Sequence, residues 1–260
     1  MGSSYTTLIV DADDGVALVT VNRPDVRNAI SQEVQADLRS ALAELGDDDQ
    51  VRAVVFTGAG DRAFVAGADI QRLSGYTSET ALQSRLQRLF DDLEAFPKPT
   101  IAAVNGFALG GGCELAMACD IRIVAQSARF GLPETALAIL PGAGGTQRLT
   151  RLVGLGHALD MILTGRVVSA SEALGMGLVS RVVPDAALPA AAHDIAAAIL
   201  ARGPLAVRLA KMVVRTGADV DQRSGLVVER LAQALLYQSD DKREGADAFL
   251  GKRSPTFAGN

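Results

Sequence analysis

Three glycine-rich loops, each leading from a strand-like or turn-like segment towards the start of a helix, constrain the fold of this chain most. Glycine fills 26 of the 260 positions, above its usual share of about 7%. Because glycine lacks a Cβ atom, it permits left-handed backbone and the close approach of a ligand or another segment. The surplus therefore marks places where the backbone itself takes an unusual shape. Ten of these glycines lie in the three loops: Gly58, Gly60 and Gly67; Gly106, Gly110, Gly111 and Gly112; Gly142, Gly144 and Gly145.

Strand-like and helix-like segments alternate through the first half of the chain. The turn-like residues Asp11–Gly15 separate the first two strand-like runs, which predicts a hairpin. Apolar residues three and four apart predict helices with one buried face over Ile30–Leu45 and Leu82–Leu93. The recurrence of strand, turn and helix predicts an α/β fold built from ββα units. Five runs of β-branched and apolar residues predict the strands: Thr7–Val10, Val16–Val21, Val51–Thr57, Thr100–Val104 and Ile121–Val124.

The second half of the chain is predicted to be mostly helical. The change from mixed strands and helices to helices alone, near residues 185–205, is the candidate boundary between regions. We therefore predict a core region over residues 1–195 and a helical C-terminal region over residues 196–260. The candidate helices are Thr146–Leu152, Ala158–Leu163, Ala170–Leu174, Ala190–Ala201, Pro204–Arg215, Ser224–Tyr237 and Lys242–Leu250.

Charge and cysteine content exclude several classes of protein. Lys and Arg number 25 against 30 Asp and Glu, so the net charge is −5 and a generally basic surface for nucleic acid is excluded. The two cysteines, Cys113 and Cys119, are too few for a disulfide framework. Neither belongs to a CxxC pair of the kind that is typical of zinc sites. The sequence predicts no metal site and no nucleic-acid partner.

The sequence also differs from that of a membrane or exported protein. The first residues, Met1–Thr6, hold neither a basic region nor an apolar signal core. The longest apolar stretch, Ile101–Ala125, contains too many polar groups for a membrane helix. We therefore expect a cytoplasmic protein without a membrane partner. The residues that interrupt the stretch are Asn105, Glu114, Asp120 and Arg122.

The most informative segment, Ala102–Glu114, is predicted to be a strand, a glycine loop and the start of a helix. The first N–H groups of a helix lack intrahelical acceptors and carry partial positive charge, so such a place suits a phosphate or a developing oxyanion. Neither a P-loop nor a G-x-G-x-x-G pattern is present. Glu114 lies among apolar neighbours in the first helical turn. It is either a glutamate favoured by the helix dipole or a carboxyl whose raised pKa suits proton transfer.

Three further features carry candidate chemistry beside ordinary structural explanations. Glu134 follows Phe130–Pro133, and a lone glutamate in a loop is most often simply solvated. The segment Pro141–Thr146 is a second glycine loop that feeds a helix, and it also fits a tight turn with a helix cap. Asp69, after the loop Val65–Ala68, is either a ligand-contacting residue or a helix N-cap.

Taken together, these segments resemble the enoyl-CoA hydratase (crotonase) family, over about residues 7 to 257. The run Gly110–Glu114 is highly specific when it is joined to the Pro-Glu pair at residues 133–134. The resemblance implies a crotonase-like superhelix of ββα turns, with a helical C-terminal region that packs in trimers. The segments that carry it are Asn22–Pro24, Asn28–Ala29, Gly58–Gly60, Phe64, Ala66–Ile70, Ala103–Asp120, Phe130–Glu134, Pro141–Leu149, Glu244–Gly245 and Ala248–Phe249.

The family resemblance also implies a catalytic site. The backbone N–H groups of Ala68 and Gly111 would form an oxyanion hole for the thioester carbonyl oxygen of an acyl-CoA. Glu114 would accept a proton from water, and Glu134 would supply a proton to the substrate's α-carbon. The Gly142 N–H group would help to orient the water. This chemistry needs no metal and no redox cofactor, and coenzyme A enters only as part of the substrate.

Coenzyme A binding is implied at three places: the loop after the second predicted strand, the two oxyanion segments and the C-terminus. Relatives often place a basic residue where Asp25 stands, so this chain departs from the pattern there. In hexameric relatives the C-terminal residues contact coenzyme A on a neighbouring subunit. The implied residues are Arg23, Asp25, Val26, Arg27, Ala66, Ala68, Asp69, Ile70, Gln71, Gly110, Gly111, Phe249 and Lys252.

The resemblance implies hydration of trans-2-enoyl-CoA to 3-hydroxyacyl-CoA, in fatty-acid β-oxidation or a related degradative pathway, by a trimer or a dimer of trimers. A Δ3-Δ2-enoyl-CoA isomerase or an acyl-CoA hydrolase of the same superfamily is the first alternative, since an isomerase needs only one carboxylate. A non-catalytic acyl-CoA or RNA-binding member is the second. The acidic balance disfavours RNA, and the complete pair of glutamates disfavours loss of catalysis.

Overall fold

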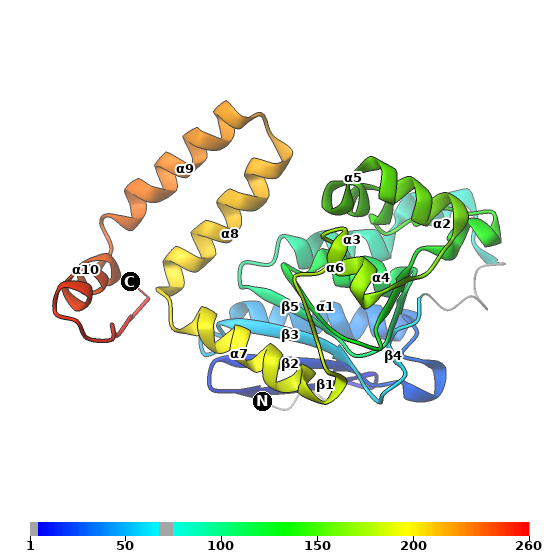
Figure 1. The fold of residues 1–260 in the computed structure, drawn as a ribbon, viewed down its shortest axis with the longest axis horizontal. Helices are drawn as coiled ribbons and strands as arrows, with labels where there is room; N and C mark the ends of the chain where they lie inside the picture. Colours follow the sequence, from blue (N-terminus) through cyan, green and yellow to red (C-terminus); the bar gives the residue numbers. More distant parts are fainter. Residues whose placement is uncertain (1–4, 68–74, 260) are drawn as a thin grey trace.

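The computed structural model of the chain describes residues 5–67 and 75–259, in which two β-sheets are surrounded by helices (Figure 1). The six-stranded sheet has the order β1-β2-β3-β5-β7-β10, parallel except for the β1–β2 hairpin. Its strands are β1 (Leu8–Asp13), β2 (Val16–Val21), β3 (Ala53–Gly58), β5 (Thr100–Val104), β7 (Ile121–Ala125) and β10 (Arg181–Val183). The four-stranded sheet has the order β4-β6-β8-β9. Its strands are β4 (Ala63–Val65), β6 (Phe107–Leu109), β8 (Arg129–Gly131) and β9 (Val168–Ser169).

The predicted ββα repeat is present three times. In each repeat one strand joins the large sheet, the next joins the small sheet, and a helical segment follows. The repeats begin at β3, β5 and β7. The helices before the C-terminal region are α1 (Gln32–Asp47), α2 (Ser78–Gln83), α3 (Arg85–Glu94), α4 (Gly111–Ala118), α5 (Gly145–Thr164), α6 (Ala170–Gly175) and α7 (Leu188–Leu200), with short 3-10 turns at η1 (Pro24–Val26), η3 (Pro133–Leu137) and η4 (Asp185–Ala187).

Both faces of the large sheet are covered by apolar side chains. Successive residues of a strand point to opposite faces, and β3 shows this directly. Val54 and Phe56 belong to the main core with α1, α3, α4 and α5, whereas Val55 belongs to a second cluster. Leu188 and Ala192 of α7 close that second cluster. Burial on both faces explains why β3 and β5 have nearly continuous apolar sequences instead of an alternating pattern.

Some local predictions differ from the observed elements. The helix predicted over Leu82–Leu93 is divided into α2 and α3 by Ser84, whose φ of 38° is left-handed. A capping box at Thr77 fixes α2 separately, and Leu82 is 83% exposed, so it does not continue the buried face of α3. The short strand β6 lies inside the predicted loop 106–112, where three residues between glycines are too few to show a period. Gly154 interrupts α5, at the predicted gap between two helices.

The C-terminal helices extend away from the sheets, in yellow to red (Figure 1). They are α8 (Pro204–Asp219), α9 (Gln222–Leu236) and α10 (Asp240–Leu250). No residue of α8 is buried and α9 buries only Ala232. The predicted division at residues 195/196 stays a prediction, and residue 195 lies within α7, which packs on the large sheet. No helix of the described part is long and apolar enough to cross a membrane.

Candidate active site

The start of helix α4 is the centre of the candidate site. All eight residues of α4 are buried, which is unusual for a segment that carries a glutamate. A Cβ atom on Gly112 would lie 1.8 Å from the Val65 carbonyl oxygen, so only glycine lets the helix start pack on the end of β4. Gly111 is the first residue of the helix, and its N–H group therefore points out of the helix without an intrahelical acceptor.

Glu114 lies one turn further along α4 and is only 2% exposed. Its Oε1 atom accepts hydrogen bonds from the backbone N–H groups of Ala143 and Gly145, each at 2.8 Å. Gly145 is the first residue of α5, so the carboxylate also lies at the positive end of that helix dipole. The glycine loop Pro141–Thr146, which also fits a tight turn with a helix cap, therefore supplies the hydrogen-bond donors to Glu114.

Burial raises the pKa of Glu114 above its ordinary value, because desolvation penalises the charged carboxylate. The two backbone N–H donors oppose this rise, and so does the positive charge of Arg148. Desolvation outweighs these favourable interactions. The raised pKa is one feature of the proton-transfer role that the sequence left open beside a simple helix-dipole role.

Glu134 lies in the short helix η3 and has a different environment. Burial raises its pKa to about 7, and the nearby charge of Glu114 adds to the rise. Its Oε2 atom is buried and has no hydrogen-bond partner among the described residues. A buried, unpartnered carboxyl oxygen disfavours the ionised form. Glu134 is therefore not the solvated loop glutamate that its sequence context alone would suggest.

Gly110 connects the second glutamate to the α4 start. A Cβ atom on Gly110 would lie 2.9 Å from Glu134 Oε1 and 3.8 Å from the Cα atom of Gly67. Three chain segments therefore meet here: the loop after β4, the start of α4 and η3. Both glutamates also influence the Cys113 thiol, whose pKa is raised chiefly by burial and further by Glu114 and Glu134. The structure thus brings the two predicted acid/base residues to the same place.

The two predicted oxyanion donors, Ala68 and Gly111, each follow directly in sequence one of the two glycines, Gly67 and Gly110, that lie against each other. Gly67 precedes Ala68, Gly110 precedes Gly111, and Gly67 lies against Leu109 and Gly110. Ala68 itself lies outside the described residues, as do Asp69, Ile70 and Gln71. Their predicted roles stay predictions.

The loop after β2 lies beside the segment that follows β4. Ala66 donates its N–H to the Arg27 carbonyl at 3.1 Å, and Ile30 donates to the Gly67 carbonyl at 2.8 Å. Asn28, which is fully buried, explains this geometry. Its side chain donates to the carbonyls of Ala59 and Ala63 and accepts from the N–H of Arg23. Predicted coenzyme A contacts at Arg23–Arg27 and at Ala66 are therefore neighbours, and Asn28 is a supporting residue that sequence reasoning did not assign.

Two other predicted contacts lie away from this site. Phe249 is 84% exposed and Lys252 follows α10. Figure 1 shows α10 at the opposite end of the long axis from α2 and α4, so this chain does not bring its own Phe249 or Lys252 to Glu114. Gly142, which is predicted to orient water, is exposed. The next residue, Ala143, donates its N–H to Glu114.

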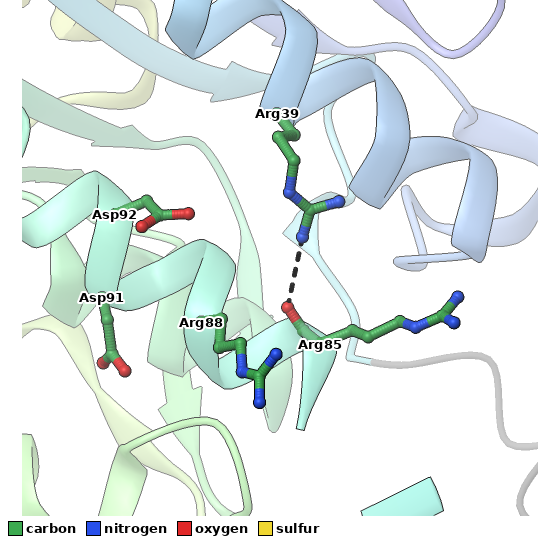
Figure 2. Close-up of a pocket in the computed structure, with 5 residues that line it drawn as sticks. All are labelled: Arg39, Arg85, Arg88, Asp91 and Asp92. Atoms are coloured by element: carbon green, nitrogen blue, oxygen red, sulfur yellow. Dashed lines mark hydrogen bonds between the residues drawn. The ribbon is translucent and has the colours of Figure 1, made fainter. Parts of the chain in front are cut away.

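A separate cavity, of about 460 Å³, lies between α1 and α3 (Figure 2). None of its lining residues is among the catalytic or coenzyme A-binding residues that the family resemblance implies. Arg39 of α1 donates to the Arg85 carbonyl at 3.4 Å, and this hydrogen bond bridges the two helices. The lining residues are Arg39, Arg85, Arg88, Asp91 and Asp92.

Sequence reasoning also did not assign a role to Arg148. Its side chain is buried, and it binds Asp91 at 2.7 Å and Glu94 at 2.8 Å. A sequence signal for it exists, because Arg148 lies three residues after the buried Gly145 and four before Leu152, which packs against the main core. An arginine on an apolar face predicts a buried ion pair. In residues 5–67 and 75–259, no group of three His, Cys, Asp or Glu side chains is arranged to hold a metal ion.

Comparisons with known proteins agree with this fold. The family model described as enoyl-CoA hydratase/isomerase matches residues 11–260. The crotonyl-CoA hydratase of Syntrophomonas wolfei is 43% identical over 256 residues, covering 98% of both chains. The short-chain-enoyl-CoA hydratase of Clostridium acetobutylicum is 42% identical over 248 residues, covering 95% of both chains. A crystal structure of enoyl-CoA hydratase from Bacillus anthracis has a TM-score of 0.95 at 43% identity, covering 98% of this chain and 100% of that chain.

The ββα architecture is therefore that of the crotonase enzymes. The chain belongs to the enoyl-CoA hydratase/isomerase family, and within it the chain is hydratase-like. The predictions of the family, the crotonase-like fold and an enzyme are confirmed.

Proposed function

We propose that the protein hydrates trans-2-enoyl-CoA thioesters to 3-hydroxyacyl-CoA, with Glu114 and Glu134 as the acid/base pair. The observation that carries this proposal is the pairing itself. Two glutamates with raised pKa values meet at one buried helix start, in a chain whose relatives are hydratases. Hydration needs a base for the water and an acid for the α-carbon, whereas isomerisation needs a single carboxyl that moves one proton.

The different environments support a division of roles between the two carboxyls. Two N–H donors and the nearby Arg148 favour the ionised form of Glu114, so we assign it as the base. Glu134 has a pKa of about 7 and an unpartnered buried oxygen, so it holds a proton near neutral pH and acts as the acid. A pair of titratable groups with unlike surroundings is the usual arrangement for acid/base catalysis.

The proposed reaction proceeds by addition of water across the C2–C3 double bond. Glu114 takes a proton from water as the oxygen forms a bond to the β-carbon. The π electrons of the double bond move to the α-carbon and the thioester carbonyl, and the α-carbon then takes a proton from Glu134. Glu114 returns its proton to Glu134 through solvent, so no net proton is gained or lost.

Developing negative charge on the thioester oxygen requires hydrogen-bond donors. We assign this function to the N–H groups of Gly111 and Ala68, and removal of one such donor costs about 10²–10³-fold in turnover. Gly111 at the helix start supports this assignment, since its N–H lies at the positive end of α4. The reaction as written needs no metal or redox cofactor, and we propose none beyond the coenzyme A of the substrate.

We further propose a homo-oligomer, a trimer or a dimer of trimers, assembled through the C-terminal helices. The α8–α9 hairpin buries almost nothing within its own chain, although it exposes many large apolar side chains. Such a surface is typical of subunit interfaces. In this arrangement, Phe249 and Lys252 reach the coenzyme A of a neighbouring subunit. The exposed residues include Met212 and Val214 of α8, and Leu226, Val227, Leu231 and Leu235 of α9; Leu250 of α10 is exposed as well.

Loss of the conjugated enoyl-thioester absorbance on incubation with crotonyl-CoA tests the proposed activity. We expect turnover with crotonyl-CoA or with a longer trans-2-enoyl-CoA, as in fatty-acid β-oxidation. No absorbance loss with any trans-2-enoyl-CoA, together with absorbance gain from a 3-enoyl-CoA, contradicts hydration and establishes the isomerase alternative. Free coenzyme A, detected with a thiol reagent, identifies a hydrolase instead. The predicted cytoplasmic location stays a prediction.

A further inference from the structure

Arg148 is a buried cation with three hydrogen-bond partners. Its Nε donates to Glu94 Oε2 at 2.8 Å, and its Nη2 donates to Asp91 Oδ1 at 2.7 Å. Its Nη1 donates to the Ala143 carbonyl at 2.9 Å. The guanidinium is planar, so two carboxylates on α3 fix the direction in which its third nitrogen points. Figure 2 shows Asp91 on α3, beside the cavity that this helix forms with α1.

The loop that Arg148 holds is the loop that holds Glu114. The Ala143 carbonyl receives the arginine, while the N–H groups of Ala143 and Gly145 donate to Glu114 Oε1. Gly144, between them, has a φ of 97°, and a Cβ atom there would lie 2.0 Å from Arg148 Nη1. The loop therefore lies directly on the guanidinium. Movement of this one side chain would displace both donors to Glu114.

The carboxylates that hold Arg148 are themselves anchored to the C-terminal region. Glu94 receives Arg148 on one oxygen and Arg215 of α8 on the other. Arg215 also binds Asp120 at 3.0 Å, and Asp120 binds Lys211 at 2.7 Å. These groups form a continuous chain of contacts from α8 to the loop at Glu114. The ion pairs also attach α8 to the body of the fold, although no residue of α8 is buried.

We propose that Arg148 is a positioning residue for Glu114, and that Glu94 and Arg215 extend this support to the C-terminal helices. The proposal rests on the proposed function, because it assumes that Glu114 transfers a proton. Arg148 makes no hydrogen bond to Glu114 among the described residues, so its effect on Glu114 passes through the loop 143–145. Its loss should change proton transfer and leave acyl-CoA binding largely intact.

The test compares kcat and KM for crotonyl-CoA in Arg148→Gln, Arg148→Lys and Arg151→Gln. Arg151 follows three residues later on α5 and is exposed, so it is the matched control. For Arg148→Gln we expect kcat to fall about 10–100-fold with KM changed less than about threefold, because small displacements of a catalytic group cause losses of this order. Arg148→Lys should recover part of kcat, since an ammonium keeps the charge but not the planar fork. Arg151→Gln should match the wild type.

The pH profile separates positioning from a merely structural role. Glu114 loses stabilising donors and a nearby positive charge in Arg148→Gln, so the acidic limb of kcat should move to higher pH. A folded Arg148→Gln protein with kcat within twofold of wild type, or with an unchanged acidic limb, would overturn the proposal. If Arg148→Gln does not fold, Glu94→Gln weakens the ion pair that holds Arg148 in place. For Glu94→Gln we expect kcat to fall about 3–10-fold. An unchanged kcat in Glu94→Gln would overturn the proposal equally.

A measurement without substrate distinguishes this proposal from the proposed function. Carbon-13 NMR of glutamate-labelled protein follows the Glu114 carboxyl, assigned by its absence in Glu114→Gln. If wild-type protein fails to hydrate any enoyl-CoA, the proposed function fails, but the Glu114 titration still reports on Arg148. A midpoint that rises in Arg148→Gln and stays constant in Arg151→Gln supports positioning. A midpoint that is the same in all three proteins contradicts it.

Discussion

The first turn of α4 and the short helix η3 each place one carboxyl in the same site, but the two carboxyls differ in burial and in hydrogen bonding. Glu114 on α4 is more buried, yet two N–H groups and an arginine support its charge. Glu134 on η3 is less buried, but one of its oxygens has no partner in the described part of the chain. Hydrogen bonding, and not depth of burial alone, therefore distinguishes the two carboxyls.

This difference originates in the backbone around each residue. Gly145 begins a regular helix and Glu114 lies against its positive end, so the donors are fixed by α5 and by the loop before it. Glu134 belongs to a five-residue 3-10 turn, in which the hydrogen bond that lowers its pKa comes from its own backbone N–H, and its Oε2 atom has no partner among the described residues. Two backbone donors therefore support the charged form of Glu114, whereas the unpartnered buried oxygen of Glu134 disfavours its charged form.

Replacement of Glu114, the proposed base, should produce the largest loss of activity. In Glu114→Gln the side chain keeps its shape but no longer accepts a proton, and we expect kcat for crotonyl-CoA hydration to fall by about 10³-fold or more. Steady-state kinetics and circular dichroism measure activity and folding. Asp194→Asn on the exposed face of α7 is the control, with wild-type turnover expected. Folded Glu114→Gln protein with near-normal turnover would remove Glu114 from the mechanism.

Replacement of the acid should be somewhat less damaging and should alter the pH profile. In Glu134→Gln we expect kcat to fall about 10²–10³-fold. Wild-type kcat/KM should decline as pH rises through about 7, because Glu134 then loses the proton that it donates. The residual activity of Glu134→Gln should lack this decline. A wild-type profile that is flat from pH 6 to 9 would speak against Glu134 as the acid.

A methyl group at the start of α5 should disturb the hydrogen bonds to Glu114, which distinguish it from Glu134. A Cβ atom on Gly145 would lie 2.8 Å from Glu114 Oε1 and 2.8 Å from the Pro141 Cβ atom. Gly145→Ala should therefore displace the carboxylate and lower kcat about 10-fold. Gly156→Ala, in open space on the same helix, is the matched control. Equal turnover in the two variants would show that the hydrogen bonds of the loop to Glu114 do not matter for catalysis.

The smallest effect should appear in stability. The folded protein holds a proton on Glu134 up to about pH 7, whereas an unfolded chain releases it near 4.5. Wild-type stability therefore falls as pH rises from about 4.5 to 7, and stays lowered above that range. Glu134→Gln removes this cost, and we expect it to be more stable at pH 8 by about 1–2 kcal/mol, after solvent screening is discounted. Urea unfolding at pH 5 and pH 8 measures the difference, and a destabilised Glu134→Gln protein at pH 8 would contradict it.

The fold and the location of the site follow from local sequence patterns. The short strands of the small sheet and the ion pairs around the site do not. Continuous apolar runs predict β3, β5 and β7, and glycine loops predict the backbone at α4 and α5. Short strands such as β6 are set by pairing across the small sheet, which no single segment contains. Arg148 and Glu94 meet across 54 positions in the sequence, so their ion pair depends on how α3 and α5 pack. The position of Arg148 among apolar residues of α5 indicates a buried ion pair, but no sequence pattern identifies Glu94 as its partner.

Titration of the Glu134 carboxyl in the substrate-free protein tests the division between the two glutamates most directly. Carbon-13 NMR of glutamate-labelled protein gives the midpoint, with the resonance assigned by its absence in Glu134→Gln. We predict a midpoint near the pKa of about 7 that burial gives this residue, and a lower midpoint in Glu114→Gln, where the neighbouring charge is gone. A Glu134 midpoint close to the ordinary value of 4.5, unaffected by Glu114→Gln, would contradict the account.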